Sequence, residues 1–290
     1  MVGKLPLVAI GEGCHPEKFL AIDAADSFTK IELLSSDMRI FALSDIHVDF
    51  DANARWISSL SAQDYREDFL ILAGDISDSL QLLAKNLELL ANRFRKVFYV
   101  PGNHDLWVIR DSDGKTSFDK FNEIAAVMEN CGVSGAPFHD DTISIVPLLG
   151  WYDYSFGEPS NELTTTWVDF LFCKWPDHLG MEEIASRFAA MNEPLIRPPN
   201  NLAISFSHFV PRIDVMPDFI SERNRIVYPV LGSILLERQI RQIRSDIHVY
   251  GHTHVNRRVD IDGTAYINNA FGYPSETRIA AKRLLCIYES

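Results

Sequence analysis

The sequence contains no hydrophobic run long enough to cross a membrane. The apolar stretch at residues 5–10 is interrupted by Pro6 and is too short for the core of a signal peptide, and no segment approaches the roughly 20 apolar residues of a membrane helix. Only four cysteines occur, without C-x-x-C spacing, which is typical of reduced thiols rather than of a disulfide framework. We therefore expect an unexported, cytoplasmic protein with no membrane partner.

The chain also lacks an excess of positively charged residues. It has 27 Lys and Arg against 40 Asp and Glu, a formal net charge of -13. Broad binding to nucleic acid or to anionic lipid depends on clustered positive charge, so neither partner is expected. The 47% hydrophobic and 23% charged residues are typical of a globular protein, and this length buries enough surface to fold without disulfides or a structural metal.

Short apolar runs alternate with helical patterns along the chain. Residues 39–44, 69–73 and 96–100 are bounded by polar or glycine positions, which indicates strands buried on both faces. Between the second and third runs, apolar residues recur at three- and four-residue spacing, at positions 80, 83, 87, 90 and 94. This spacing predicts a helix with one apolar face. Together they form a β-α-β unit, which favours an α/β fold.

The alternation continues to the C-terminus. Further helices are expected at 118–131, ended by Gly132, and at 233–244, and further strands at 143–149, 202–207 and 247–250. Antiparallel sheet is expected at 258–267, around the turn Asp262-Gly263, and at 283–288. We expect a single domain over residues 1–290: an N-terminal extension of unassigned role at 1–37, a core formed by 38–150 and 201–290, and an insertion or cap at 151–200 with one helix near 181–191.

Polar residues with metal-binding chemistry follow five of the expected strands. They occur as Asp45-x-His47, Gly74-Asp75-x-x-Asp78, Gly102-Asn103-His104-Asp105, the single His208, and Gly251-His252-x-His254. Open α/β sheets place their ligand sites at the carboxyl ends of strands. Carboxylate oxygen and imidazole nitrogen bind Mn, Fe and Zn, and an amide oxygen can join them. In an extended segment, residues i and i+2 also project to the same side.

In this order, the five motifs resemble those of the calcineurin-like metallophosphoesterases, and the match spans residues 45–254. The resemblance implies a four-layer metallophosphoesterase β-sandwich, in which two mixed sheets are flanked by helices. It also implies two metal ions at the strand ends, Mn, Fe or Zn. By motif position, the first metal would be bound by Asp45, His47 and His254, the second by Asn103, His208 and His252, and Asp75 would bridge both.

The resemblance further implies an enzyme that hydrolyses phosphate esters, with a metal-bridging hydroxide as the nucleophile. His104 would stabilise the phosphoryl charge or protonate the departing oxygen. Asp78 and Asp105 would accept hydrogen bonds from a ligand imidazole or from His104; for Asp78, helix capping is an equal alternative. A small-molecule or nucleotide phosphodiester or phosphomonoester is the expected substrate. A nuclease, a pyrophosphatase, a protein phosphatase or a non-catalytic binding scaffold of the same fold are the alternatives.

Three other residues are candidates for substrate binding. Arg212, four residues after His208, has the bidentate guanidinium that suits a phosphoryl group. Trp107 and Tyr152 follow strand ends and could stack on a base or an aryl group. A purely structural role is the alternative for each, and the sequence does not predict an oligomeric state.

Overall fold

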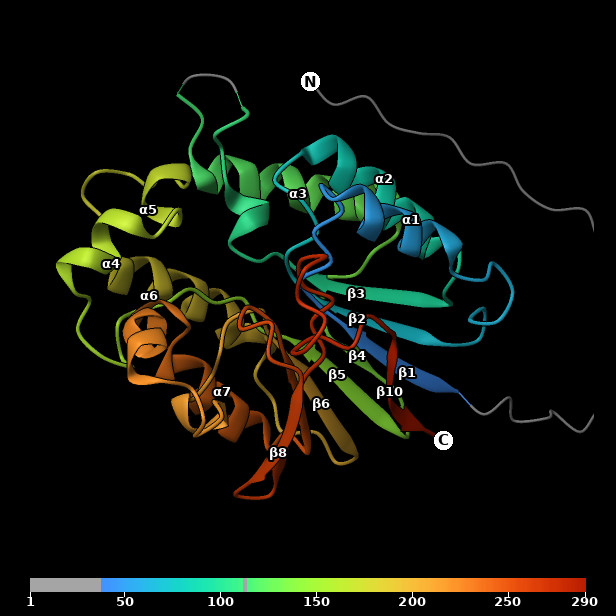
Figure 1. Cartoon of the computed structure of the whole chain (residues 1–290). Helices are drawn as coiled ribbons and strands as arrows, with labels where there is room; N and C mark the ends of the chain where they lie inside the picture. The colour runs from blue at the N-terminus through green and yellow to red at the C-terminus, as the bar shows by residue number, and fades with distance from the viewer. Residues whose placement is uncertain (1–37, 112–113) are drawn as a thin grey trace, which may run out of the picture. The chain divides into compact units, whose positions relative to one another are not determined.

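The computed structural model describes residues 38–111 and 114–290, so the extension expected at 1–37 lies outside the described residues. The first of two mixed sheets has the strand order β10-β1-β2-β3 (Figure 1). Its strands β1 (Arg39–Leu43), β2 (Phe69–Ala73) and β3 (Lys96–Val100) are parallel, and β10 (Leu285–Glu289) pairs antiparallel with β1. The expected α/β fold with mixed sheets is confirmed.

The second sheet has the strand order β4-β5-β6-β7-β9-β8. Its parallel centre consists of β5 (Ile143–Pro147), β6 (Leu202–Phe206), β7 (Ile247–Tyr250) and β9 (Thr264–Asn268), and its antiparallel edges are β4 (Phe138–His139) and β8 (Arg257–Ile261). Strands β8 and β9 form the expected hairpin. The antiparallel strand expected at 283–288 is confirmed as β10, whose partner is β1 in the first sheet.

Alternating side chains divide each sheet between two cores. Ile40 and Ala42 face the second sheet, where they pack in one cluster with Ile145 and Ile204. The other faces pack against helices: α1 (Asp51–Ser59), α2 (Leu80–Ala91) and α3 (Ser117–Cys131) cover the first sheet, and α6 (Met181–Asn192) and α7 (Ile234–Ile243) cover the second (Figure 1). The result is the expected order of helices, sheet, sheet and helices.

The segment at 151–200 contains more helix than expected. Besides α6, it contains α4 (Asn161–Thr166), α5 (Asp169–Phe172) and a 3-10 turn, Glu193–Leu195. Helices this short leave no periodic signal in a sequence, and α1 was missed for a similar reason. Three more 3-10 segments lie elsewhere, at His104–Leu106, Ile213–Val215 and Glu222–Val230.

No helix within the described residues is both long and apolar enough to cross a membrane.

Candidate metal centre

The seven residues proposed as metal ligands lie at the carboxyl ends of five strands, and the structure brings them together in one cluster. Many of them have an unusual backbone conformation. Five of the nine non-glycine residues with positive φ in the described chain belong to this set: Asp45, His47, Asp75, His252 and His254. Left-handed conformations are unfavourable for residues with a Cβ and concentrate at functional sites. The tight turns after the strands therefore aim these side chains inward at a conformational cost.

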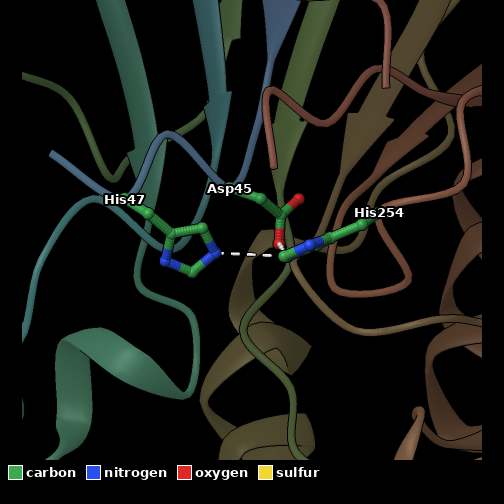
Figure 2. Close-up of side chains that lie close together, drawn as sticks. All are labelled: Asp45, His47 and His254. Atoms are coloured by element: carbon green, nitrogen blue, oxygen red, sulfur yellow. Dashed lines mark hydrogen bonds and ion pairs between the residues drawn. The ribbon is translucent and has the colours of Figure 1, made fainter. Parts of the chain in front are cut away.

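One half of the cluster consists of Asp45, His47 and His254 (Figure 2). The Nε2 atoms of the two histidines lie 3.1 Å apart, and Asp45 Oδ1 lies 3.3 Å from His254 Nε2. Asp45 also accepts a hydrogen bond from the backbone N–H of His252, at 3.0 Å. Two imidazole nitrogens at this distance need a proton or a cation between them, so this half has the donor set of a metal site.

The other half is formed by Asn103, His208, His252 and Asp75. His208 Nε2 lies 3.0 Å from Asn103 Oδ1, 3.2 Å from His252 Nδ1 and 3.5 Å from Asp75 Oδ2. The same Asp75 oxygen lies 4.0 Å from His47 Nε2 in the first half. Asp75 is thus the carboxylate shared between the two halves.

Three of the four ligand imidazoles have their second nitrogen occupied by a fixed partner. His208 Nδ1 lies 2.9 Å from the Ala73 carbonyl, His252 Nε2 lies 3.1 Å from the Val230 carbonyl, and His254 Nδ1 lies 2.7 Å from Glu276 Oε2. Such contacts fix the tautomer and leave the opposite nitrogen free to bind a metal. Glu276 was not predicted from the sequence, because it belongs to none of the five motifs that follow the strands.

The pKa values of the clustered histidines and carboxylates also favour the binding of cations. Burial lowers the pKa of His47 and of His252 to about 3, which keeps both rings in the neutral form that binds metals. Burial, together with Asp105 and Asp45, raises the pKa of Asp75 well above its usual value. Burial opposes the protonation of His254, yet Asp45 and Glu276 raise its pKa to about 9. A bound cation would relieve the carboxylate repulsion and displace that proton.

His104 lies at the entrance to the cluster. Its Nε2 is 3.9 Å from Asp75 Oδ2 and 3.4 Å from the Tyr273 hydroxyl, and its backbone N–H donates to Asp75 at 2.9 Å. Trp107 packs against the His104 ring with 3.6 Å between ring centroids. The indole of Trp107 thus supports the His104 ring and also lines a smaller cavity beside it, and its stacking on a substrate stays a prediction.

The expected partners of Asp105 and Asp78 were wrong. Asp105 contacts no ligand imidazole; it accepts backbone N–H bonds from Asp75, Ile76, Ser77 and Gly102, at 2.8 to 3.0 Å, and so joins the turns after β2 and β3. Asp78 does not cap α2, because Ser79 does.

Asp78 instead forms an ion pair with Arg110 at 2.9 Å. Burial and the neighbouring Asp49 raise its pKa to about 6. Neither interpretation of Asp78 made from the sequence therefore describes its contacts.

A carboxylate from the segment at 151–200 reaches the cluster, and it was not predicted from the sequence. Asp169, at the start of α5, is fully buried and accepts hydrogen bonds from Asn103 Nδ2 at 2.9 Å, Trp107 Nε1 at 2.7 Å and Trp167 Nε1 at 2.8 Å. The bond to Asn103 turns its carbonyl oxygen toward His208. Asp169 therefore orients a proposed ligand and the support of His104 together.

Two proposed substrate-binding residues lie away from the cluster. Arg212 forms ion pairs with Asp214, Glu237 and Asp262, at 2.6 to 3.1 Å, so its guanidinium is already neutralised. Tyr152 is fully buried in the core against Trp151. Both predictions were wrong, and the structural alternative describes each residue.

Close packing explains Gly102. A Cβ at this position would lie 2.2 Å from Asp75 Oδ1 and 2.7 Å from His208 Cε1, so a side chain would displace two proposed ligands.

A cavity of about 350 Å³ opens onto this cluster and reaches Asp75, Asn103, His104, His252 and His254. The site is therefore open to a small-molecule group.

A helix-flanked pair of mixed sheets, with clustered histidines and carboxylates at the strand ends, defines a metal-dependent hydrolase. The family model described as calcineurin-like phosphoesterase matches residues 38–256. The chain therefore belongs to this family, which confirms the resemblance, and it is a phosphoester hydrolase that uses divalent metal ions.

Relatives are consistent with this assignment. The chain is 26% identical over 278 residues to the acyl-carrier-protein phosphodiesterase PptH of Mycobacterium tuberculosis, covering 85% of this chain and 82% of that protein. The crystal structure of the phosphopantetheinyl hydrolase PptH from Mycobacterium tuberculosis matches the fold with a TM-score of 0.71 at 22% identity, covering 87% of this chain and 96% of that chain.

Proposed function

We propose that the chain is a binuclear phosphodiesterase whose two metals share Asp75. The observation that carries the proposal is the convergence of donors on both sides of this one carboxylate, at 3.5 Å from His208 Nε2 and 4.0 Å from His47 Nε2. Asp45, His47 and His254 would hold the first metal, Asn103, His208 and His252 the second, and Asp75 would contact both.

The donor set of imidazole, carboxylate and one amide suits Mn, Fe or Zn, and we propose these as the native metals. When bound, the metals supply positive charge to the phosphoryl oxygens and lower the pKa of a water molecule, which makes it nucleophilic at neutral pH. The protein holds the ligands rigid through Asp105, Asp169 and Glu276, so the ligand oxygen and nitrogen atoms need little reorganisation on binding.

His104 lines the cavity beside the ligand cluster, so it can reach a phosphoryl group held there. Its ring is clamped between Trp107 and the Tyr273 hydroxyl. From this position the imidazole N–H can donate a hydrogen bond to a phosphoryl oxygen or to the oxygen of the departing group. We assign His104 to this role.

The substrate that we propose is the phosphodiester between a pantetheine group and a serine of a carrier protein. The support is the 26% identical relative, named as an acyl-carrier-protein phosphodiesterase, which this chain covers over 82% of its length. A cytoplasmic location is part of the proposal. The three described cysteines, Cys131, Cys173 and Cys286, are free, in keeping with a reducing compartment.

The test is to strip the purified protein with a chelator, restore it with Mn, and supply bis(p-nitrophenyl) phosphate, p-nitrophenyl phosphate and a phosphopantetheinylated carrier protein. We expect metal-dependent release of nitrophenol, faster from the diester. We also expect the carrier protein to lose the mass of one phosphopantetheine in mass spectrometry. Metal binding without hydrolysis of any of the three would contradict the proposal and favour a binding scaffold.

A further inference from the structure

The cavity at the metal centre continues into an apolar groove. One end is formed by the proposed ligands. The other end is lined by side chains from the segment at 151–200 and from the region before α7: Trp167, Val168, Met216, Ile220, Val227 and Leu231. Its total volume of about 350 Å³ lies within the usual range for small-molecule sites. The groove therefore offers space for a substituent of the phosphate and not only for the phosphate itself.

The charges of the groove restrict that substituent. No Lys or Arg is among the described residues that line it. Its two acidic residues are engaged, since Asp75 belongs to the ligand cluster and Glu276 contacts His254 Nδ1 at 2.7 Å. A second phosphate on the substrate would thus find no cationic partner here and would lose its hydration without compensation. The groove favours an uncharged chain.

Polar groups are present, but they are neutral. Asn224, Thr253 and Tyr228 line the groove, and their amide and hydroxyl groups can donate to and accept from amide groups. A pantetheine chain is uncharged, carries two amides and is otherwise largely aliphatic, so it matches both the apolar wall and these polar groups.

The site has a second opening for the other substituent of a diester. His104 and Tyr273 line the groove and also a smaller cavity of about 290 Å³, which contains His47, Phe50, Asp78 and Arg110. The second cavity contains the Asp78–Arg110 ion pair and so differs in chemistry from the groove. Two unlike openings that meet at His104 suit a phosphate with two unlike substituents.

We propose that the groove binds the pantetheine half of the diester, which makes it the determinant of substrate choice; this rests on the function proposed above. In the reaction, the oxygen of water forms a bond to phosphorus and the bond from phosphorus to the serine oxygen breaks. The serine oxygen takes up a proton, and the phosphate stays on the pantetheine in the groove. The groove excludes substrates in which the half that keeps the phosphate carries further phosphate groups.

Two diesters with the same leaving group test this assignment. Methyl p-nitrophenyl phosphate presents only a methyl group to the groove, whereas the p-nitrophenyl ester of 4′-phosphopantetheine presents the whole chain. Nitrophenolate leaves far more readily than an alkoxide, so the same bond breaks in both. We expect the metal-loaded protein to show kcat/KM at least about 10-fold higher for the pantetheine ester, equivalent to about 1.4 kcal/mol of binding in the groove.

Charged substitutions in the groove, each with a control next to it, locate the effect. Ile220→Asp places a carboxylate in the lining, and Phe219→Asp places one at the neighbouring side chain, which is 77% exposed and lies outside the lining. Val168→Asp and Leu171→Asp form a second pair, with Leu171 58% exposed and outside the lining. We expect both groove variants to lose about 10-fold in kcat/KM on the pantetheine ester alone, and both controls to keep it.

The outcomes separate this inference from the proposed function. Cleavage of the methyl ester with equal kcat/KM for the pantetheine ester would overturn the role of the groove and leave the phosphodiesterase standing. Failure to cleave either ester would overturn the proposed function itself. If a groove variant also loses the methyl ester, its fold or metal site is damaged, and the second pair of variants then decides the question.

Discussion

The two walls of the active site differ in almost every physical property. The wall that carries the proposed metal ligands is buried, its polar atoms have fixed partners, and many of its residues adopt strained backbone conformations. The opposite wall, formed by Trp167, Val168 and the residues near Ile220, is apolar and partly exposed, and it comes from short helices and 3-10 segments. Rigid strands hold one wall and irregular segments hold the other.

This contrast indicates that one wall carries out the reaction and the other selects the substrate. A strand end held by buried hydrogen bonds positions a ligand atom precisely, which metal chemistry requires. An irregular segment can change its side chains at little cost to the fold, so it can adapt to another substituent. Substitutions in the ligand wall should therefore affect all substrates alike, and those in the groove should affect them selectively.

The largest effect is expected from Asp75→Asn. The variant keeps the shape of the shared side chain but removes its negative charge, so at least one metal is lost and activity falls by at least about 1000-fold on every diester. Metal content, measured by elemental analysis alongside kcat, checks this. Asp260→Asn, at a carboxylate whose side chain is 69% exposed, serves as the control and should retain both. Full activity in the Asp75 variant would refute the shared ligand.

His104→Ala should lower kcat by about 100-fold while leaving both metals bound, since His104 is not one of the seven proposed ligands. A comparison of nitrophenyl with alkyl leaving groups separates the two possible roles. An equal loss on both indicates stabilisation of phosphoryl charge, and a larger loss on the alkyl ester indicates proton donation to the departing oxygen. A variant as active as the unmodified protein would exclude both roles.

Asp169→Asn tests whether the two walls are coupled. An amide in place of the carboxylate must place its own NH₂ against Trp167 Nε1 or against Asn103 and Trp107, and it loses the negative charge, so the contact that orients Asn103 is weakened. We expect metal affinity to fall by about 10- to 100-fold, visible as a higher Mn concentration for half-maximal activity, with kcat largely restored at saturating Mn. Asp177→Asn, an exposed carboxylate of the same segment, should behave as the unmodified protein does.

The smallest effect concerns stability beneath the ligand wall. His248 on β7 is fully buried between the hydroxyls of Ser205 and Ser207, and burial lowers its pKa to about 3. The unfolded chain binds a proton near pH 6.5 and the folded chain only near pH 3, so stability falls as the pH drops through this window, by on the order of a few kcal/mol in total.

His248→Gln should flatten this acid dependence. Urea unfolding of the metal-free protein between pH 4 and pH 7, conditions set by the window of about 3 to 6.5, measures the change. The exposed His178→Gln should leave the slope as it is. An unchanged slope in the His248 variant would mean that other groups control acid unfolding.

The sequence predicted the strands and the ligand wall well because both leave local signals. An apolar run such as Phe69–Ala73 and the residues that follow it are adjacent in the chain, so the pattern identifies both together. Asp169 and Glu276 could not be found in this way, since each meets its partners only through the folded structure, 66 residues away in the case of Asn103. The partner of β10 was missed for the same reason.

Proximity in the chain also misled the interpretation of Arg212. The residue lies four positions after His208, but its guanidinium meets Glu237, 25 residues further on, and turns away from the cluster. Charge pairing over such distances is decided by packing and not by a local pattern. Trp107 lies beside the site, as the sequence predicted, but its contacts with His104 and Asp169 could not be predicted from a local pattern.

The positive φ angles at the strand ends bear on how the enzyme can be engineered. Each left-handed residue costs roughly 1–2 kcal/mol that glycine would not, and five of them belong to the proposed ligand cluster. Replacing Asp75 by glycine should thus make the metal-free chain harder to unfold while destroying the site, because burial and the neighbouring Asp105 and Asp45 already oppose its negative charge. Selection for thermal stability alone would favour such inactive chains, so a stabilisation screen on this scaffold needs an activity readout at every round.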